Sequence, residues 1–250
     1  MSVAPPSYSD TPTTSPTAAQ LFPTLVGQRI ILCSSSPRRL ALLTQLGLPV
    51  EVIASGFEEN LSKSDYDLTP WEYATATATE KILAVYRSVA NDRHEPRLLL
   101  ASDTIILCGH QILEKPTSPD AHLAMLKQLR GVPHKVFTAV AALAPNDEMP
   151  VAPGYVLRTH LAETTVTFDA SLSDDVLVEY VKSGEGSDKA GGYAIQGQGA
   201  VLVDKIEGSY DAVVGLPLNA TYKLIHEVLN YDIYAAQDGE EEEDEGDEEA

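Results

Sequence analysis

Residues 29–40, RIILCSSSPRRL, place an apolar strand, a turn of serines and the start of a helix in direct succession. Ser36 suits the cap of that helix and Pro37 its first position. Arg38 and Arg39 bring positive charge to the helix end at which the macrodipole favours acids by roughly 0.3–1 kcal/mol. An anion bound by the free amides, the serine hydroxyls and the arginines would remove this conflict, so the stretch predicts a phosphate site. Two solvated arginines on a surface helix are the alternative.

Patterns in the rest of the chain predict strands and helices that alternate loosely, with hairpins between some strands. Further strands are expected at about 50–54, 98–107, 111–114, 135–143, 155–168 and 200–206. Helices are expected after caps at Ser36, Thr69, Ser118 and Ser173, and from about Leu218. This arrangement is typical of an α/β fold, a mixed twisted sheet flanked by helices.

Composition divides the chain into three parts. Residues 1–24 are rich in Ser, Thr and Pro and are expected to form a disordered arm, 25–235 the folded domain, and 236–250 a disordered acidic tail. The net charge is −20, but residues 238–250 hold ten acids and no base, which leaves 27 acids against 17 bases elsewhere. This balance argues against a broad nucleic-acid surface, whereas a small polyanion in a local basic pocket fits it. The tail itself could contact basic proteins.

Cysteine use and hydropathy predict where the protein resides. Cys33 and Cys108 lie in or beside apolar runs and are expected to be buried thiols of a reducing compartment. No apolar stretch approaches the roughly 18–20 residues of a membrane span. The first 28 residues contain no lysine or arginine and no apolar segment typical of a signal peptide. We therefore expect a cytoplasmic protein without membrane contact.

An acidic residue, Asp103, interrupts the apolar run 98–107, which otherwise suits a buried strand. Burying an unpaired carboxylate costs several kcal/mol, so this one needs a cation, a metal or hydrogen-bond donors. It could serve as a metal ligand or as a base that activates water. A structural salt bridge or a cap at the strand end is the alternative.

Other charged residues are less distinctive when each is taken alone. Lys81 lies on a predicted helix, Lys115 precedes a proline at a strand end, and Glu58 and Glu59 form a pair in a loop. Each is more often a surface charge. The acids available favour a hard cation such as Mg²⁺ or Mn²⁺ over zinc, and no phosphate-loop or zinc motif occurs.

The segment 184–199 is too rich in glycine for a simple connector. Glycine lets a backbone approach a ligand closely or adopt a positive φ. Asp188 and Lys189 bring both signs of charge to the segment, and Gln196 offers a donor and an acceptor that could bind the imide edge of a pyrimidine. A flexible surface loop is the alternative.

Several of these motifs occur together in a recognisable order. They are Ser34-Ser35-Ser36-Pro37-Arg38-Arg39, Ser102-Asp103-Thr104, Glu114-Lys115-Pro116, Asp188-Lys189-Ala190-Gly191 and Ile195-Gln196-Gly197. From about Arg29 to Leu229 the chain resembles the Maf family. The resemblance implies a nucleoside triphosphate pyrophosphatase with a central cleft and a fold like that of the inosine triphosphatases. Such enzymes release a nucleoside monophosphate and pyrophosphate.

The resemblance also implies roles for particular residues. The catalytic acid is Asp103, which together with Glu59 would hold a divalent metal, Mg²⁺ or Mn²⁺. The catalytic lysines are Lys81 and Lys115. The substrate-binding residues are Ser34, Arg38, Arg39, Thr104, Asp188, Lys189 and Gln196. A homodimer is a further implication.

Arg, Thr and Gln at three selectivity positions mark the branch of the family that prefers dTTP and UTP, and here those positions are Arg38, Thr104 and Gln196. Ser102 and Ala194 depart from the small residue and the glycine that are common in the family. Two other functions stay open from the sequence. One is a nucleotide-binding regulatory protein with little catalysis, and the other is an interaction protein that acts through its acidic tail.

Overall fold

The structure is a computed structural model that describes residues 21–58, 61–146 and 154–231. The predicted acidic tail 236–250 and most of the predicted arm lie outside the described residues. The arm was predicted to extend to residue 24, but Phe22 is only 1% exposed and belongs to the core. Its ring packs against Tyr222 and His226, which lie near the C-terminal end of the described residues. The boundary of the folded domain therefore lies before Phe22.

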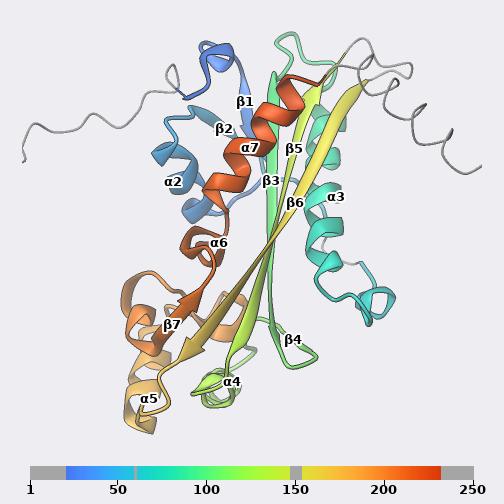
Figure 1. The fold of residues 1–250 in the computed structure, drawn as a ribbon. Helices are drawn as coiled ribbons and strands as arrows, with labels where there is room; N and C mark the ends of the chain where they lie inside the picture. The colour runs from blue at the N-terminus through green and yellow to red at the C-terminus, as the bar shows by residue number, and fades with distance from the viewer. Residues whose placement is uncertain (1–20, 59–60, 147–153, 232–250) are drawn as a thin grey trace, which may run out of the picture.

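The described residues form a mixed sheet, as predicted. Its strands are β1 (Ile30–Leu32), β2 (Val50–Val52), β3 (Leu98–Cys108), β4 (Gln111–Leu113), β5 (His134–Pro145), β6 (Tyr155–Phe168) and β7 (Val203–Glu207). They follow the order β2-β1-β3-β5-β6-β7, and β4 forms a hairpin with β3 (Figure 1). The β1 strand pairs in parallel with β2 and β3, whereas the other pairs are antiparallel.

Helices cover both faces of this sheet. The helices are α2 (Pro37–Gln45), α3 (Glu72–Val89), α4 (Pro119–Leu129), α5 (Asp174–Ser183), α6 (Tyr210–Val214) and α7 (Leu218–Leu229). Short 3₁₀ turns are η1 (Pro23–Leu25), η2 (Lys63–Tyr66), η3 (Ala190–Gly192) and η4 (Gly197–Leu202). Helix α3 packs on one face, and α6 and α7 pack on the other (Figure 1). Two separate hydrophobic clusters result, one on each side of the sheet.

The faces of β3 decide what surrounds its polar residues. Successive side chains of a strand point to opposite faces. Leu98 and Leu100 pack in the cluster that contains α7, and Leu99 and Ala101 in the cluster that contains α3. By this alternation Ser102 and Thr104 face α6, whereas Asp103 faces α3.

One edge of β3 is open along its middle. The parallel pairing with β1 ends at Leu100, and the antiparallel pairing with β4 begins at Ile106. Within the described part of the chain, no strand pairs with this edge over residues 101–105. A ligand at the carboxyl end of β1 can therefore reach both faces of β3, the usual location of sites in open α/β sheets.

Some boundaries differ from the predictions. Helix α3 begins at Glu72, two residues later than expected, because the Thr69 hydroxyl bonds the Glu72 carboxylate at 2.8 Å instead of capping a backbone amide. Strand β7 begins at Val203 instead of residue 200, because η4 takes up the residues before it. After β7 the chain forms α6, a helix that was not predicted.

The two cysteines differ in burial. Cys33 is fully buried as predicted, and burial raises the pKa of its thiol to about 12. Cys108 is only partly buried, at the end of β3. Within residues 21–58, 61–146 and 154–231, no helix combines the length and the apolar character that crossing a bilayer requires.

Candidate active site

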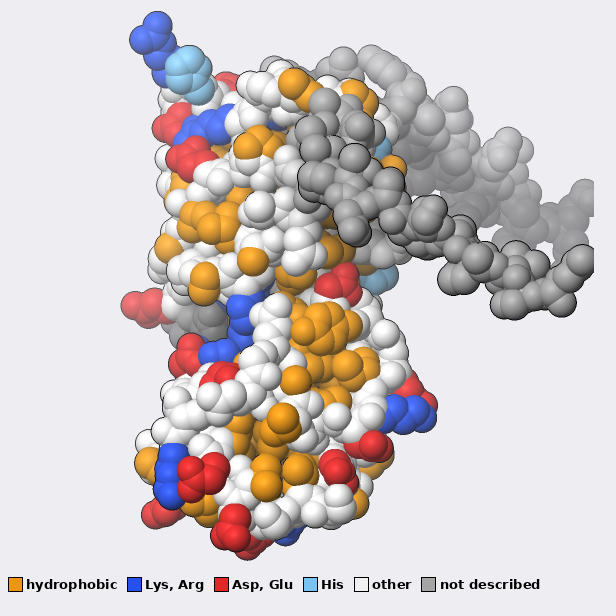
Figure 2. Space-filling model, turned by 90° about the vertical axis from the view of Figure 1, so that its left-hand side faces the viewer, with side chains coloured by type: hydrophobic (Ala, Val, Ile, Leu, Met, Phe, Trp, Pro, Cys, Tyr) orange, Lys and Arg blue, Asp and Glu red, His pale blue; other side chains and the backbone are white. Residues whose placement is uncertain are grey.

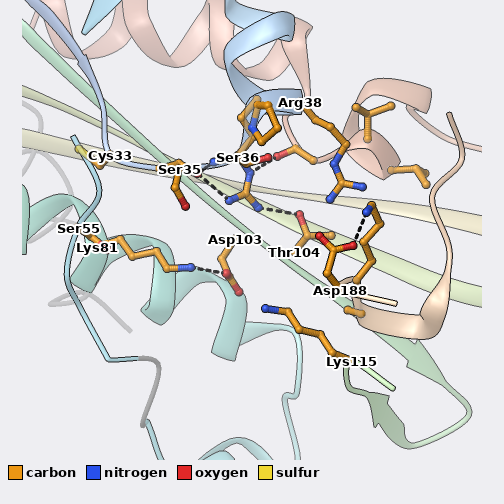
Figure 3. Close-up of a pocket in the computed structure, with 18 of the residues that line it drawn as sticks. Cys33, Ser35, Ser36, Arg38, Ser55, Lys81, Asp103, Thr104, Lys115 and Asp188 are labelled. Carbon is orange, nitrogen blue, oxygen red and sulfur yellow. Dashed lines mark hydrogen bonds and ion pairs between the residues drawn. The ribbon is translucent and has the colours of Figure 1, made fainter. Parts of the chain in front are cut away.

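A cavity of about 600 Å³ lies where β1 ends and the open edge of β3 begins. Its wall combines the serine turn and first residues of α2, the middle of β3, the glycine-rich loop and Gly215 (Figure 3). Figure 2 shows Lys and Arg side chains gathered at mid-height on this side of the molecule, between the levels of α2 and α5. Among the described residues, five basic and two acidic side chains line the cavity. An acidic protein thus contains a locally basic pocket.

Most residues predicted for the site meet in this cavity. Those that line it are Ser34, Arg38, Arg39, Lys81, Asp103, Thr104, Lys115, Asp188 and Lys189. Gln196 is exposed and does not line it, although its neighbour Ile195 does. Glu59 lies outside the described residues. The arginines of the first helix and the acid of the strand, which are far apart in sequence, therefore share one site.

Lys81 and Asp103 form a buried ion pair. The ammonium of Lys81 donates to Oδ1 of Asp103 at 2.8 Å, and each residue is only 8% exposed. Taken alone, Lys81 was more typical of a surface charge. One face of α3 packs on β3, however, and buries this side chain. Asp103 is both a salt-bridge partner and part of the cavity wall. The ion pair explains how a carboxylate is kept within an apolar strand.

Arg39 is held by three acceptors from separate segments. Its Nε donates to the carbonyl of Gly215 at 2.9 Å, and its two terminal nitrogens donate to Oγ of Ser34 and Oγ1 of Thr104, each at 3.3 Å. The guanidinium therefore joins the end of β1, the middle of β3 and the residue after α6. Such a fork is fixed in position before any ligand arrives.

A second layer of hydroxyls orients these contacts. Thr138 donates its hydroxyl hydrogen to the carbonyl of Ala212 at 2.7 Å, so in its 3.0 Å contact with Thr104 it accepts. Ser102, fully buried, donates at 2.9 Å to the same Gly215 carbonyl that Arg39 uses. The departure from the usual small residue at position 102 thus adds a contact at this anchor point. Sequence reasoning assigned no role to Thr138 or Gly215.

Two cations reach the cavity without a hydrogen-bond partner among the described residues, namely Arg38 and Lys115. Both side chains point into the space between α2, β3 and the glycine-rich loop, Lys115 towards Asp103 (Figure 3). Burial lowers the pKa of Arg38, while the nearby Asp188 charge opposes that shift. Asp188 in turn pairs with Lys189, which lowers the pKa of its carboxyl group. Uncompensated positive charge in a cavity favours a polyanionic ligand.

Residues 29–228 match the family model described as "Maf-like protein". The chain belongs to the Maf family. A curated relative from Schizosaccharomyces pombe, named dTTP/UTP pyrophosphatase, is 51% identical over 93% of this chain and 98% of its own length. Proteins of the same name from Thermoanaerobacter sp. and Escherichia coli O157:H7 are 37% and 40% identical over 79% and 78% of this chain. The alignments cover 95% and 91% of those two relatives. The resemblance to the Maf family that the sequence motifs indicated is therefore confirmed.

In this Maf protein the glycine-rich loop is bonded to buried side chains around it. His122 of α4 donates through Nε2 to the Gly192 carbonyl at 2.5 Å. The hydroxyl of Tyr180 on α5 accepts the Ala194 amide at 3.0 Å. Nothing local in the sequence shows which backbone groups these two side chains contact. The loop is therefore built as part of the cavity wall.

His134 of β5 contacts the same wall of the cavity through a buried hydrogen bond. It is 1% exposed, its Nε2 lies 2.9 Å from the Tyr193 hydroxyl, and Tyr193 lines the cavity. Burial lowers the pKa of His134 to about 4 from an ordinary value of 6.5. The neutral imidazole is thus the form that the folded protein prefers.

Acid should therefore destabilise the fold through His134. Between pH 6.5 and pH 4 the unfolded chain binds a proton at this histidine that the folded protein does not bind, so the free energy of unfolding falls as the pH falls. From pH 7 to pH 5 this group should remove about 2 kcal/mol. Urea unfolding of the wild type and of His134→Phe at both pH values measures it, since other titrating groups affect both proteins alike. An equal loss in the two proteins would contradict the assignment.

Proposed function

We propose that this Maf protein is a nucleoside triphosphate pyrophosphatase that hydrolyses dTTP and UTP to the nucleoside monophosphate and pyrophosphate. The observation that carries the proposal is the meeting of Asp103 and the basic side chains in one cavity. Curated relatives that match almost their whole length to this chain are named dTTP/UTP pyrophosphatases. A regulatory protein that only binds nucleotides would not need a carboxylate kept inside a strand at that point.

The basic residues suit the triphosphate. Ser36 stands at the cap of α2, but its side chain makes no capping hydrogen bond, which leaves first-turn amides for another acceptor such as a phosphate oxygen. Arg39 is already oriented, whereas Arg38 and Lys115 still have hydrogen-bond donors to offer. Neutralising the phosphates and the departing pyrophosphate is the main demand of phosphoryl transfer. These side chains supply that charge.

Asp103 would take the proton of the attacking water. Lys81 bonds one of its oxygens, Oδ1, and among the described residues no hydrogen bond to Oδ2 is formed. A carboxylate that is fixed by one oxygen and lines the cavity is suited to orient water for in-line attack. The hydrogen bond from Lys81 holds the carboxylate in one orientation beside the cavity.

A divalent cation fits this donor set. Mg²⁺ is usually bound by one or two carboxylates together with substrate phosphate oxygens. Asp103 provides one carboxylate in the cavity, and Glu59 is the second ligand proposed for Mg²⁺ or Mn²⁺. No group of three or more metal-binding side chains occurs among the described residues. When bound, the cation would neutralise phosphate charge and polarise the bond that breaks.

Product analysis tests the proposal directly. The protein should convert dTTP and UTP to the monophosphates with release of pyrophosphate, which phosphate detection reveals only after inorganic pyrophosphatase is added. Chromatography should show dTMP or UMP without dTDP or UDP. Tight binding of dTTP without turnover, in the presence of Mg²⁺ or Mn²⁺, would favour a regulatory role.

Base selection is proposed to involve Gln196 together with Arg38 and Thr104. The Gln196 amide can both donate and accept, as the imide edge of thymine or uracil requires. Gln196→Glu should lower kcat/KM for dTTP and UTP about tenfold or more, because a carboxylate repels the imide carbonyls. Kinetics with both nucleotides measure this. Unchanged nucleotide preference in the variant would remove Gln196 from base selection.

A further inference from the structure

Glu185, in the glycine-rich loop, forms hydrogen bonds with two other parts of the same loop. The carboxylate of Glu185 accepts the amides of Gln198 and Gly199 at 2.9 and 3.0 Å. Its backbone carbonyl accepts the Lys189 ammonium at 2.8 Å. A single residue thus joins the start of the loop to its cavity-lining middle and to its end.

The Glu185 carboxylate accepts hydrogen bonds from amides at the start of η4, as a capping side chain normally does. Gln196 occupies the N-cap position of η4, yet its own side chain makes no capping hydrogen bond. Glu185 instead supplies the acceptors for the amides of Gln198 and Gly199, which follow it by 13 and 14 positions in the chain. The Gln196 amide group is therefore left without a hydrogen bond among the described residues and can serve a ligand.

The residues around the Glu185 carboxylate leave room for its hydrogen bonds to the backbone. Gly197 has φ +70°, and a Cβ on it would lie 2.8 Å from Oε2 of Glu185. The Tyr180 hydroxyl accepts the Ala194 amide; burial raises the pKa of this hydroxyl, and the nearby Glu185 carboxylate adds to the shift. The segment that carries Gln196 is thus held after it by the Glu185 carboxylate and before it by the Tyr180 hydroxyl.

We propose that Glu185 is a positioning residue whose carboxylate fixes the backbone around Gln196 and so sets the preference of the site for its base. This rests on the proposed function, since it concerns the nucleotide that the cavity receives. Neither Glu185 nor Gln196 lines the cavity, whereas Ile195, next to Gln196, does. It acts through the placement of another side chain.

A double-mutant cycle tests the proposal. Glu185→Ala should raise KM for dTTP about tenfold with kcat within about twofold, because a binding contact is lost equally in the ground and transition states. In a Gln196→Ala background the same change should have less than about a twofold further effect on kcat/KM. Glu179→Ala, which removes an exposed glutamate of α5, is the matched control and should change neither constant.

Hydrogen exchange provides a readout that does not depend on activity. The amides of Gln198 and Gly199 should lose protection in Glu185→Ala and keep it in Glu179→Ala. Glu185→Gln, which retains one acceptor oxygen, should give an intermediate KM and serves if the alanine variant does not fold. Equal losses from Glu185→Ala in both backgrounds, or unchanged protection, would overturn the proposal. A wild-type protein inactive on dTTP and UTP would instead refute the proposed function, while exchange would still test whether Glu185 holds this backbone.

Discussion

The Asp103→Asn variant should turn over dTTP at least about a hundredfold more slowly than the wild type and remain folded. The amide has the shape of the carboxylate, and its oxygen can still accept the hydrogen bond from Lys81. It has no basic oxygen at neutral pH, so the water loses its proton acceptor. Steady-state kinetics with dTTP and UTP measure the loss, and circular dichroism establishes that the fold is retained.

Asp188→Asn is the matched control for this experiment. Asp188 lines the same cavity, but its side chain is exposed and paired with Lys189, so its charge is already compensated. Its loss should slow turnover by less than about tenfold. Wild-type turnover in Asp103→Asn, or equal losses in the two variants, would remove Asp103 from its role as base.

Lys81→Met should have the second largest effect, and it should affect stability as well as activity. Removing one partner of a buried ion pair leaves the other charge uncompensated, which costs about 3 kcal/mol. Asp103, at 8% exposure, is the charge left behind. Urea unfolding should show the loss, and turnover should fall because the carboxylate is no longer held in place by Lys81.

Lys115→Met makes the same chemical change at an exposed position. Lys115 lines the cavity but forms no ion pair among the described residues, so its replacement should alter stability by less than about 0.5 kcal/mol. Turnover should still fall, since a phosphate contact is lost. The double variant Lys81→Met with Asp103→Asn should recover part of the stability that Lys81→Met loses. Equal stability of Lys81→Met and wild type would show that the buried pair contributes nothing to the fold.

Local sequence patterns were sufficient to predict the strands and the helix that carry the site residues. The apolar run before the serines, the proline at the helix start and the acid inside a strand each depend on neighbours along the chain. The structure confirms the strand, the helix and the hairpins that they predict. The errors are at boundaries, as at α3 and β7, where a side chain or a 3₁₀ turn redirected a few hydrogen bonds.

Burial was harder to predict than secondary structure. Lys81 alone is a typical surface residue, and only the packing of α3 on β3 brings it to Asp103, 22 positions away. His122, Tyr180 and Glu185 support the glycine-rich loop through bonds to backbone groups, which have no signature in the sequence. The reason is that these contacts join segments whose approach depends on the whole fold.

The sequence by itself determined that this protein has a strand, a serine turn and a basic helix start, an acid in an apolar strand, and membership of the Maf family. Tertiary structure decided that these parts form one site. The parallel pairing of β1 with β3 ends at Leu100, so the serine turn lies beside Asp103 and Thr104. Strand register and side-chain burial arise from contacts between distant segments, and local sequence encodes only the elements that make those contacts.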